Sequence, residues 1–276
     1  MLGRDVVEAF EGRGHEVVPL THDELEIVDG PRVDATVGEI EPDALINCAA
    51  WTDVDGAEAH EREAMAVNDT GAGLLAVAAG TVGASMVYPS SDYVFDGAKG
   101  APYVESDLPH PISAYGRSKL AGETSVAAAN SRHIIARSAW LFGVGGRNFV
   151  ETMIRLGTEQ PEVLVVSDQV GSPTYTRHLA TAIAMLTESE DYGIHHVSGG
   201  GSCSWFEFAQ EIFDQAALPA RVMAARTEML ARPAPRPAYS VLESERRDPV
   251  VLPDWRAALA EYMIERERAA TAGNAG

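Results

Sequence analysis

Short apolar segments alternate with longer segments of helical periodicity along most of this chain. The apolar segments have the length of strands, and they lie at 15–20, 43–48, 84–89, 132–138 and 194–198. Between them, apolar residues recur at helical spacing in the segments 31–40, 68–83 and 176–188. This alternation predicts an α/β fold, a doubly wound parallel sheet with helices on both faces. Ligands of such a fold bind beyond the C-terminal ends of the strands.

The pattern becomes irregular after residue 138, with a Gly-rich segment at 141–148 and a Pro-rich segment at 232–239. Irregular loops of this kind often carry specificity. We predict a dinucleotide-binding core formed by residues 1–138 and 170–200, and a smaller, substrate-binding lobe formed mainly by 139–169 and 201–276. The last residues, 270–276, are expected to form a loose end.

The charge of the chain limits its partners. Its 276 residues include 41 Asp and Glu against 21 Lys and Arg, a formal net charge of −20. Such a surface repels nucleic acids and anionic membranes. The sequence has two cysteines and no apolar run of the roughly 18 residues that a membrane span needs. We therefore predict a cytoplasmic protein without a nucleic-acid or membrane partner, and the spacing of its His, Cys and acidic residues indicates no metal site.

A tyrosine and a lysine, Tyr115 and Lys119, stand four residues apart among good helix formers. Residues at this spacing share one helix face, with Cβ atoms about 5–6 Å apart. Lysine is scarce in this chain, with two among 21 basic residues, so chance does not account well for the pair. An ammonium beside a phenol favours the phenolate and lowers the tyrosine pKa from about 10. The pair is therefore predicted to act in general acid or base chemistry near neutral pH.

Longer motifs surround this pair. They are SSDYVFDG (90–97), SAYGRSKLAGE (113–123), RSAWLFG (137–143), DQVGSPT (168–174) and RPAPRPAYSVLES (232–244). In this order, and over nearly the whole chain, they resemble the dTDP-4-dehydrorhamnose reductases, which are extended short-chain dehydrogenase/reductases acting on nucleotide sugars. The resemblance implies a Rossmann-like fold with a smaller C-terminal substrate lobe.

The resemblance also implies catalytic roles. Tyr115 is the expected general acid for the C4 oxygen of the sugar, while a nicotinamide cofactor delivers hydride to C4. Lys119 is expected to hold the nicotinamide ribose and to lower the Tyr115 pKa, and Ser91 to hydrogen-bond the substrate carbonyl. These roles fit the chemistry, because hydride addition builds negative charge on an oxygen that two hydroxyl donors stabilise.

Further positions correspond to substrate contacts of the family. By this resemblance Asp92, Tyr93 and Trp140 contact the sugar together with Ser91. Arg236 is predicted to pair with the substrate diphosphate, because a guanidinium fork matches phosphate oxygens, although Arg232 is equally available.

The expected cofactor site draws on several segments. By resemblance it consists of Gly3, Glu26, Ile27, Ala49, Ala50, Thr52 and Pro89, together with Tyr115 and Lys119. Small residues in the turn at 48–58 permit close approach of the backbone to a nucleotide, whereas Glu26 stands where the family usually has Asp. NADPH is the predicted cofactor and NADH the alternative, because neither a clear ribose-binding acid nor a clear arginine for a 2′-phosphate can be identified.

The start of the sequence departs from the family. Relatives begin with a strand and a G-x-x-G-x-x-G turn, of which only Gly3 corresponds here, so the sequence is expected to open inside a helix. In this fold the turn presents helix N–H groups to the pyrophosphate. We expect the natural polypeptide to carry roughly ten more residues, a strand of about 5–6 and the turn. A chain that starts at Met1 is expected to bind its cofactor weakly, to be poorly stable and to have an unfilled slot in its sheet.

Several other polar residues are expected to have structural rather than catalytic roles. Asp53 and Asp55 are expected to serve the turn or a helix start. Asn68 has two readings, a helix cap or a brace for the site, with capping favoured. His195 and His196 point to opposite faces of a strand and are expected to be structural. Cys48 is expected to end a buried strand.

The predicted function is reduction of the C4 keto group of dTDP-4-dehydro-6-deoxy-L-mannose to dTDP-L-rhamnose with NADPH. One alternative is a reductase of another 4-keto-6-deoxy nucleotide sugar, because pocket shape selects the sugar. The other is a non-catalytic, nucleotide-binding regulatory subunit. The protein is expected to be a monomer or a homodimer.

Overall fold

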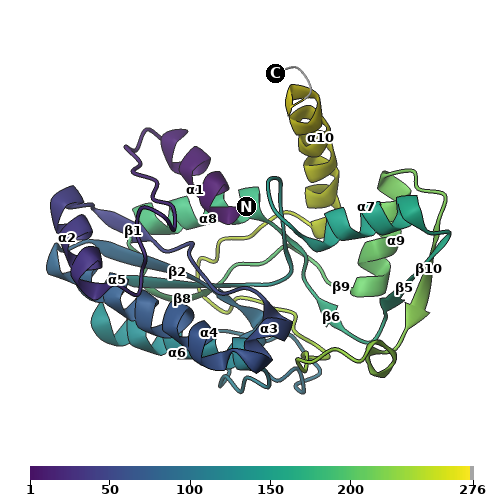
Figure 1. The fold of residues 1–276 in the computed structure, drawn as a ribbon, viewed down its shortest axis with the longest axis horizontal. Helices are drawn as coiled ribbons and strands as arrows, with labels where there is room; N and C mark the ends of the chain where they lie inside the picture. The colour runs from purple at the N-terminus through teal and green to yellow at the C-terminus, as the bar shows by residue number, and fades with distance from the viewer. Residues whose placement is uncertain (274–276) are drawn as a thin grey trace.

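A parallel sheet forms the centre of the molecule in the computed structural model, which describes residues 1–273 (Figure 1). The order of its strands is β1 (Ala44–Ile46), β2 (Ser85–Ser91), β3 (His133–Ser138) and β8 (Gly193–His196). All neighbours in this order are parallel. Ser91, the last residue of β2, lies beside Ser138, the last residue of β3. The predicted α/β class with a parallel sheet is therefore confirmed.

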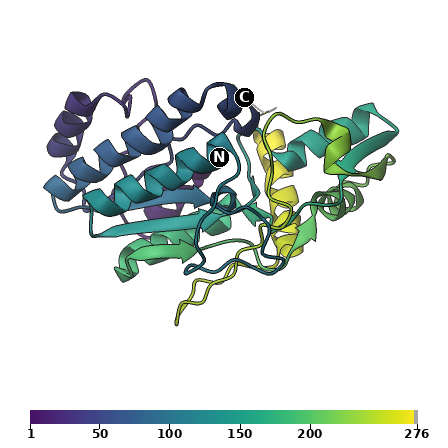
Figure 2. The same cartoon turned by 90° about the horizontal axis from the view of Figure 1, so that it is seen from below.

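Helices cover both faces of this sheet (Figures 1 and 2). One face carries α2 (Gly30–Ile40), α5 (Ala72–Thr81) and α6 (Ala114–Ala129), and the other carries α1 (Leu2–Glu11) and α8 (Thr176–Ser189). Each layer buries its own apolar cluster against the strands, with Val33 and Leu75 in the first and Phe10 and Leu179 in the second. Helix α1 begins at Leu2, next to the start of the given sequence.

A second group of elements lies beyond one end of the sheet, at the right of Figure 1. It contains α7 (Phe149–Glu159), β5 (Glu162–Val166), α9 (Trp205–Gln215), β10 (Arg221–Ala225) and α10 (Trp255–Gly273). Strands β5 and β10 pair in parallel, and Phe142, Phe208 and Trp255 belong to the aromatic cluster that the helices enclose. Helix α10 includes residues 270–273 of the predicted loose end, and residues 274–276 lie outside the described part.

Short elements connect these layers. They are α3 (Val54–Ala59), α4 (Glu61–Met65), the π-helix η1 (Ala66–Gly71), the 3-10 helices η2 (Asp92–Val94) and η3 (Thr227–Leu230), and the strand pairs β4 (Leu141–Phe142) with β7 (Thr174–Tyr175) and β6 (Val170–Gly171) with β9 (Cys203–Ser204).

Two local expectations are wrong. Segment 15–20 forms no strand, and Val18 is 52% exposed. A strand needs a neighbour for its backbone groups, and no described segment pairs with 15–20. Cys48, expected in a buried position, is exposed, because it follows β1, a strand that pairs with β2 alone.

Helix α6 approaches its neighbours closely at Gly122. A Cβ atom at this position would overlap the Asn68 carbonyl oxygen and the Tyr88 hydroxyl group. By contrast, Gly38 is an exposed residue of α2 and has open space where a Cβ would stand. Both glycines lie within helices, but only Gly122 is tightly packed, so Gly38 is a suitable control for a substitution at Gly122.

We predict that Gly122→Ala lowers the free energy of unfolding by about 1–3 kcal/mol, the usual cost of overpacking. Gly38→Ala should raise it by about 0.5–1 kcal/mol, because alanine favours a helix interior. Urea unfolding of both variants measures the difference. Equal stability of the two variants would contradict the close approach of α6.

Candidate active site

Tyr115 and Lys119 lie in the first turns of α6, directly beside the end of β2. Ser113 caps this helix by accepting a hydrogen bond from the Gly116 N–H at 3.1 Å. Lys119 is buried, and its ammonium donates to the Pro89 carbonyl oxygen at 2.9 Å. The same ammonium lies 3.9 Å from the centroid of the Tyr88 ring. Helix α6 thus brings a buried cation against the carboxyl-terminal half of β2.

Burial shifts the pKa of both residues. It lowers the pKa of Lys119 to about 7, although the negative charge of Glu123 acts in the opposite direction. It raises the pKa of Tyr115 to about 12, although the nearby Ser91 hydroxyl opposes the rise. The expectation of a lowered Tyr115 pKa is therefore wrong for this structure, because desolvation of the phenolate prevails. Tyr115 is a neutral phenol at neutral pH, the protonated form that an acid requires.

Ser91 lies where β2 turns into η2. Its hydroxyl donates to Asp92 Oδ1 at 3.0 Å and accepts from the Tyr93 N–H at 3.2 Å. Burial raises the pKa of Asp92 to about 6 despite the hydroxyls of Ser240 and Ser91. The Tyr93 ring meets the Tyr115 ring edge-on at 5.5 Å between centroids. The structure thus brings the predicted catalytic residues and two of the predicted sugar contacts together.

Unpartnered polar atoms mark the ends of three neighbouring strands. Asn47 Nδ2 follows β1, Asp92 Oδ2 follows β2, and Ser138 Oγ ends β3. They are three of the four buried side-chain atoms without a hydrogen-bond partner in the described residues. Buried polar atoms are seldom left unpaired. Their position fits a polar ligand bound across the C-terminal edge of the sheet, where doubly wound folds bind nucleotides.

The turn after β1 is held by Asn68. Its Oδ1 accepts from the Trp51 N–H at 2.9 Å, and its Nδ2 donates to the Trp51 carbonyl oxygen at 3.1 Å and to Ser118 Oγ at 2.9 Å. Asn68 therefore braces the turn against α6, and the favoured expectation that it caps a helix is wrong, because it lies inside η1. Asp53 does cap a helix, α3, by accepting from the Gly56 N–H at 2.9 Å.

The other predicted cofactor residues occupy different surroundings. Within the turn, Ala49 and Thr52 are exposed and Ala50 is partly exposed. Ile27 is buried in the apolar layer beside Gly71, whereas Glu26 is partly exposed. Gly3 lies at the start of α1, where an added Cβ would stand 3.4 Å from Cys48 Cβ. The start of α1 and the turn after β1 are therefore close in space.

The Arg236 guanidinium forms hydrogen bonds to other residues of the chain. Its Nη2 donates to Asp55 Oδ2 at 2.9 Å and its Nη1 to the Ala234 carbonyl oxygen at 2.8 Å. Arg232 also pairs with Asp55, at 3.4 Å, but its side chain is 60% exposed. Burial raises the pKa of Asp55, but hydrogen bonds from Arg236 and the Ala234 N–H hold it below its usual value. Asp55 thus lies in the first turn of α3, as expected, and also connects this helix to the Pro-rich segment.

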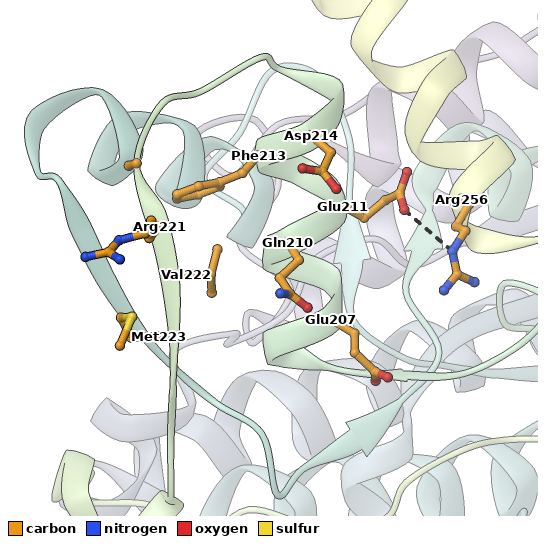
Figure 3. A pocket seen from close by; sticks show the side chains of 10 residues that line it. Glu207, Gln210, Glu211, Phe213, Asp214, Arg221, Val222, Met223 and Arg256 are labelled. Carbon is orange, nitrogen blue, oxygen red and sulfur yellow. Dashed lines mark ion pairs between the residues drawn. The ribbon is translucent and has the colours of Figure 1, made fainter.

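A groove lies elsewhere, between α9, β10 and the start of α10 (Figure 3). Its volume is about 520 Å³, and its walls carry Glu207, Glu211 and Asp214, with Arg256 paired to Glu211 at 3.6 Å. None of the predicted site residues lines it.

Comparisons with known proteins agree on one family. The family model described as "RmlD substrate binding domain" matches residues 1–268. The chain is 43% identical over 271 residues to a dTDP-4-dehydrorhamnose reductase of Streptomyces griseus, covering 95% of this chain and 89% of the relative. The chain belongs to the RmlD substrate binding domain family. It is also 40% identical over 244 residues to a dTDP-4-keto-6-deoxy-D-glucose reductase of Streptomyces niveus, covering 88% of this chain and 85% of the relative.

A solved structure of similar sequence has the same fold. It is the crystal structure of a dTDP-4-dehydrorhamnose reductase from Bacillus anthracis in complex with NADP, with a TM-score of 0.93 and 41% identity, covering 96% of this chain and 95% of that chain. The family resemblance and the Rossmann-like fold predicted from the sequence are therefore confirmed.

In this RmlD family member, Trp140 lies two residues after the end of β3 and has an unusual backbone conformation. Its φ of 50° is left-handed, a conformation that bulky residues seldom adopt. Its ring stacks on Trp205 with 3.5 Å between centroids, and it lies directly against Gly171. Strained residues of this kind cluster at ligand sites. The stack holds Trp140 in place beside the end of the sheet.

Sequence reasoning missed Glu123 and Arg137. Glu123 stands at the position i+8 from Tyr115 and i+4 from Lys119, so the helix-face argument that found the pair extends to it. Arg137 is a charged residue within an apolar strand, and a buried charge needs a partner. Both signals are present in the sequence.

Among the helices that the structure describes, none combines the length and the apolar character required to cross a bilayer.

Proposed function

We propose that this chain reduces the C4 keto group of dTDP-4-dehydro-6-deoxy-L-mannose with NADPH and releases dTDP-L-rhamnose. The observation that carries the proposal is the meeting of Ser91, Tyr115 and Lys119 at the end of β2, beside unpartnered polar atoms that fit a nucleotide ligand. Membership of the RmlD family and 43% identity to a named reductase support the same reaction.

In the proposed mechanism, bound NADPH supplies a hydride to C4. The Tyr115 hydroxyl donates its proton to the C4 oxygen as negative charge develops there. The Ser91 hydroxyl, which donates to Asp92 in the structure, turns its single proton to the same oxygen. Tyr115 is left as a phenolate. The Lys119 ammonium, on the same face of α6, stabilises this anion, which offsets part of the cost that burial imposes on it.

Other residues would orient the two ligands. Asp92, Tyr93 and Trp140 line the sugar, and Arg236 retains N–H groups for the diphosphate beyond the two that it gives to Asp55 and Ala234. Gly3, Glu26, Ile27, Pro89 and the turn residues Ala49, Ala50 and Thr52 are proposed to contact the cofactor.

The same proposal divides the chain as the sequence suggested, with residues 139–169 and 201–276 forming most of the substrate lobe. We also propose that the protein works in the cytoplasm as a monomer or a homodimer. Light scattering in solution distinguishes the two oligomeric states.

A second candidate is reduction of a different 4-keto-6-deoxy sugar. It is favoured by the relative from Streptomyces niveus, which is named for the D-glucose compound and whose identity to this chain is close to that of the rhamnose enzyme. The configuration of the product at C4 and C5, read by NMR, separates the two reactions. Stoichiometric co-purification with a partner enzyme, without turnover of either sugar, would indicate a regulatory subunit instead.

Replacing the proposed acid tests the reaction. Tyr115→Phe should lower kcat by about 10²–10⁴-fold, the usual contribution of a positioned acid, and leave NADPH affinity within a few-fold. The readout is the loss of nicotinamide absorbance on mixing protein, NADPH and the 4-keto sugar. The exposed pair formed by Tyr192 and Arg132 offers a control, because Tyr192→Phe should keep wild-type turnover. Equal kcat in the Tyr115 variant and the wild type would refute the role.

The two arginines of the Pro-rich segment provide a second test. If Arg236 holds the diphosphate, Arg236→Ala raises KM for the sugar nucleotide about 10- to 100-fold, because a hydrogen bond to a charged group contributes about 1.5–3 kcal/mol. Arg232→Ala is the matched control and should change KM little, because this side chain is largely exposed. A larger effect for Arg232 than for Arg236 would reverse the assignment.

A further inference from the structure

Helix α6 carries a buried carboxylate, Glu123, one turn beyond Lys119. Its partner is Arg137 on β3, and the Glu123 and Arg137 side chains are 4% and 2% exposed. Arg137 donates from Nε to Oε1 at 2.9 Å and from Nη2 to Oε2 at 2.7 Å. Burying both ions costs their hydration, and apolar side chains of similar size often stabilise a core as well or better. The pair therefore points to a role beyond packing.

Glu123 has a third partner on β2, the strand that ends in Ser91. Ser90 donates from its hydroxyl to Glu123 Oε1 at 2.5 Å. The residue before Ser90 is Pro89, whose carbonyl oxygen accepts from Lys119 at 2.9 Å. Consecutive residues of β2 are thus bonded to Lys119 and Glu123, which lie on one face of α6. This double attachment fixes the helix that carries Tyr115 relative to the strand that carries Ser91.

We propose that Glu123, held in place by Arg137, is a positioning residue that keeps Lys119 charged and aligned for the reduction. The proposal rests on the proposed function for its catalytic consequence. Its effect on the charge of Lys119 can be measured without any substrate.

Few charges face the Lys119 ammonium. The ring of Tyr88 on β2 lies beneath it, Tyr115 precedes it on its own helix, and Cys48 approaches from the end of β1. Cys48 is exposed as a residue, but the chain packed around its sulfur desolvates the thiolate and raises the thiol pKa to about 12, so this group is neutral near pH 7. Glu123 is therefore the carboxylate that opposes the loss of the Lys119 proton. Without it, Lys119 should be neutral over more of the physiological pH range.

The chain is well suited to a direct measurement, because Lys99 and Lys119 are its two lysines. NMR of isotope-labelled lysine should therefore show two side-chain signals, with Lys99 as the internal reference. Wild-type Lys119 should titrate near pH 7, because burial lowers its pKa to about 7. It should lose its proton as the pH rises through this value. In Glu123→Gln the midpoint should move to lower pH. An unchanged or higher midpoint would overturn the proposal.

Turnover supplies the second readout. In Glu123→Gln, kcat at pH 8 should fall roughly tenfold, a modest part of what a positioned acid contributes, and the alkaline limb of the profile should move to lower pH. KM should change less than kcat, because the buried Glu123 carboxylate is bonded to Ser90 and Arg137 of the protein. Glu190→Gln is the matched control at the exposed pair with Arg132, and it should leave the profile as in the wild type.

A double variant separates this role from a structural one. Glu123→Gln leaves Arg137 buried without a counter-ion and can fail to fold, whereas Glu123→Gln with Arg137→Met removes both charges. The folded double variant should keep the lowered Lys119 midpoint and the reduced kcat. Wild-type values of both in the double variant would show that the pair is structural only. If the wild type itself turns over no 4-keto sugar, the proposed function fails, while the NMR midpoints still decide the role of Glu123.

Discussion

The close contact of helix α6 with strand β2 determines the geometry of the site. Gly122 removes the side chain that would hold the two apart, and the Tyr88 hydroxyl donates to the Asn68 carbonyl oxygen at 2.8 Å beside it. Because α6 carries Tyr115 and β2 ends in Ser91, this contact sets the distance between two hydroxyl donors. The same contact buries Lys119 and so lowers its pKa. The positions of the hydroxyl groups and the pKa of the lysine therefore depend on the same packing.

Burial has opposite effects on the two ionisable groups of α6. Tyr115 is kept neutral and Lys119 is brought close to losing its proton, since each loses hydration of its charged form. A neutral phenol can give up a proton, but the phenolate that remains needs a cation nearby. The buried carboxylate of Glu123 maintains that cation. In the proposed reaction, a buried residue of α6 thereby controls the charge of another residue on the same helix.

Local patterns in the sequence were sufficient to predict much of the fold and part of the site. The strands at 84–89 and 132–138 and the Tyr115–Lys119 helix depend on short-range periodicity, and the structure contains them. The predicted strand at 15–20 is wrong because a strand also requires a neighbouring strand, and the periodicity of a segment does not show whether such a neighbour exists. The raised Tyr115 pKa was missed because desolvation depends on the packed environment, whereas the neighbouring charge was visible in the sequence. The Ser90–Glu123 bond joins residues 33 apart in the chain, which no local pattern contains.

The meeting of Tyr115 and Ser91 at the reacting carbon is tested most directly by a structure of this protein with NADP and dTDP-L-rhamnose bound. We expect Tyr115 Oη and Ser91 Oγ both to lie within hydrogen-bonding distance of the C4 oxygen, with the nicotinamide ring facing C4. A C4 oxygen that contacts neither hydroxyl, or a sugar bound away from the end of β2, would show that the two hydroxyls do not carry the reaction.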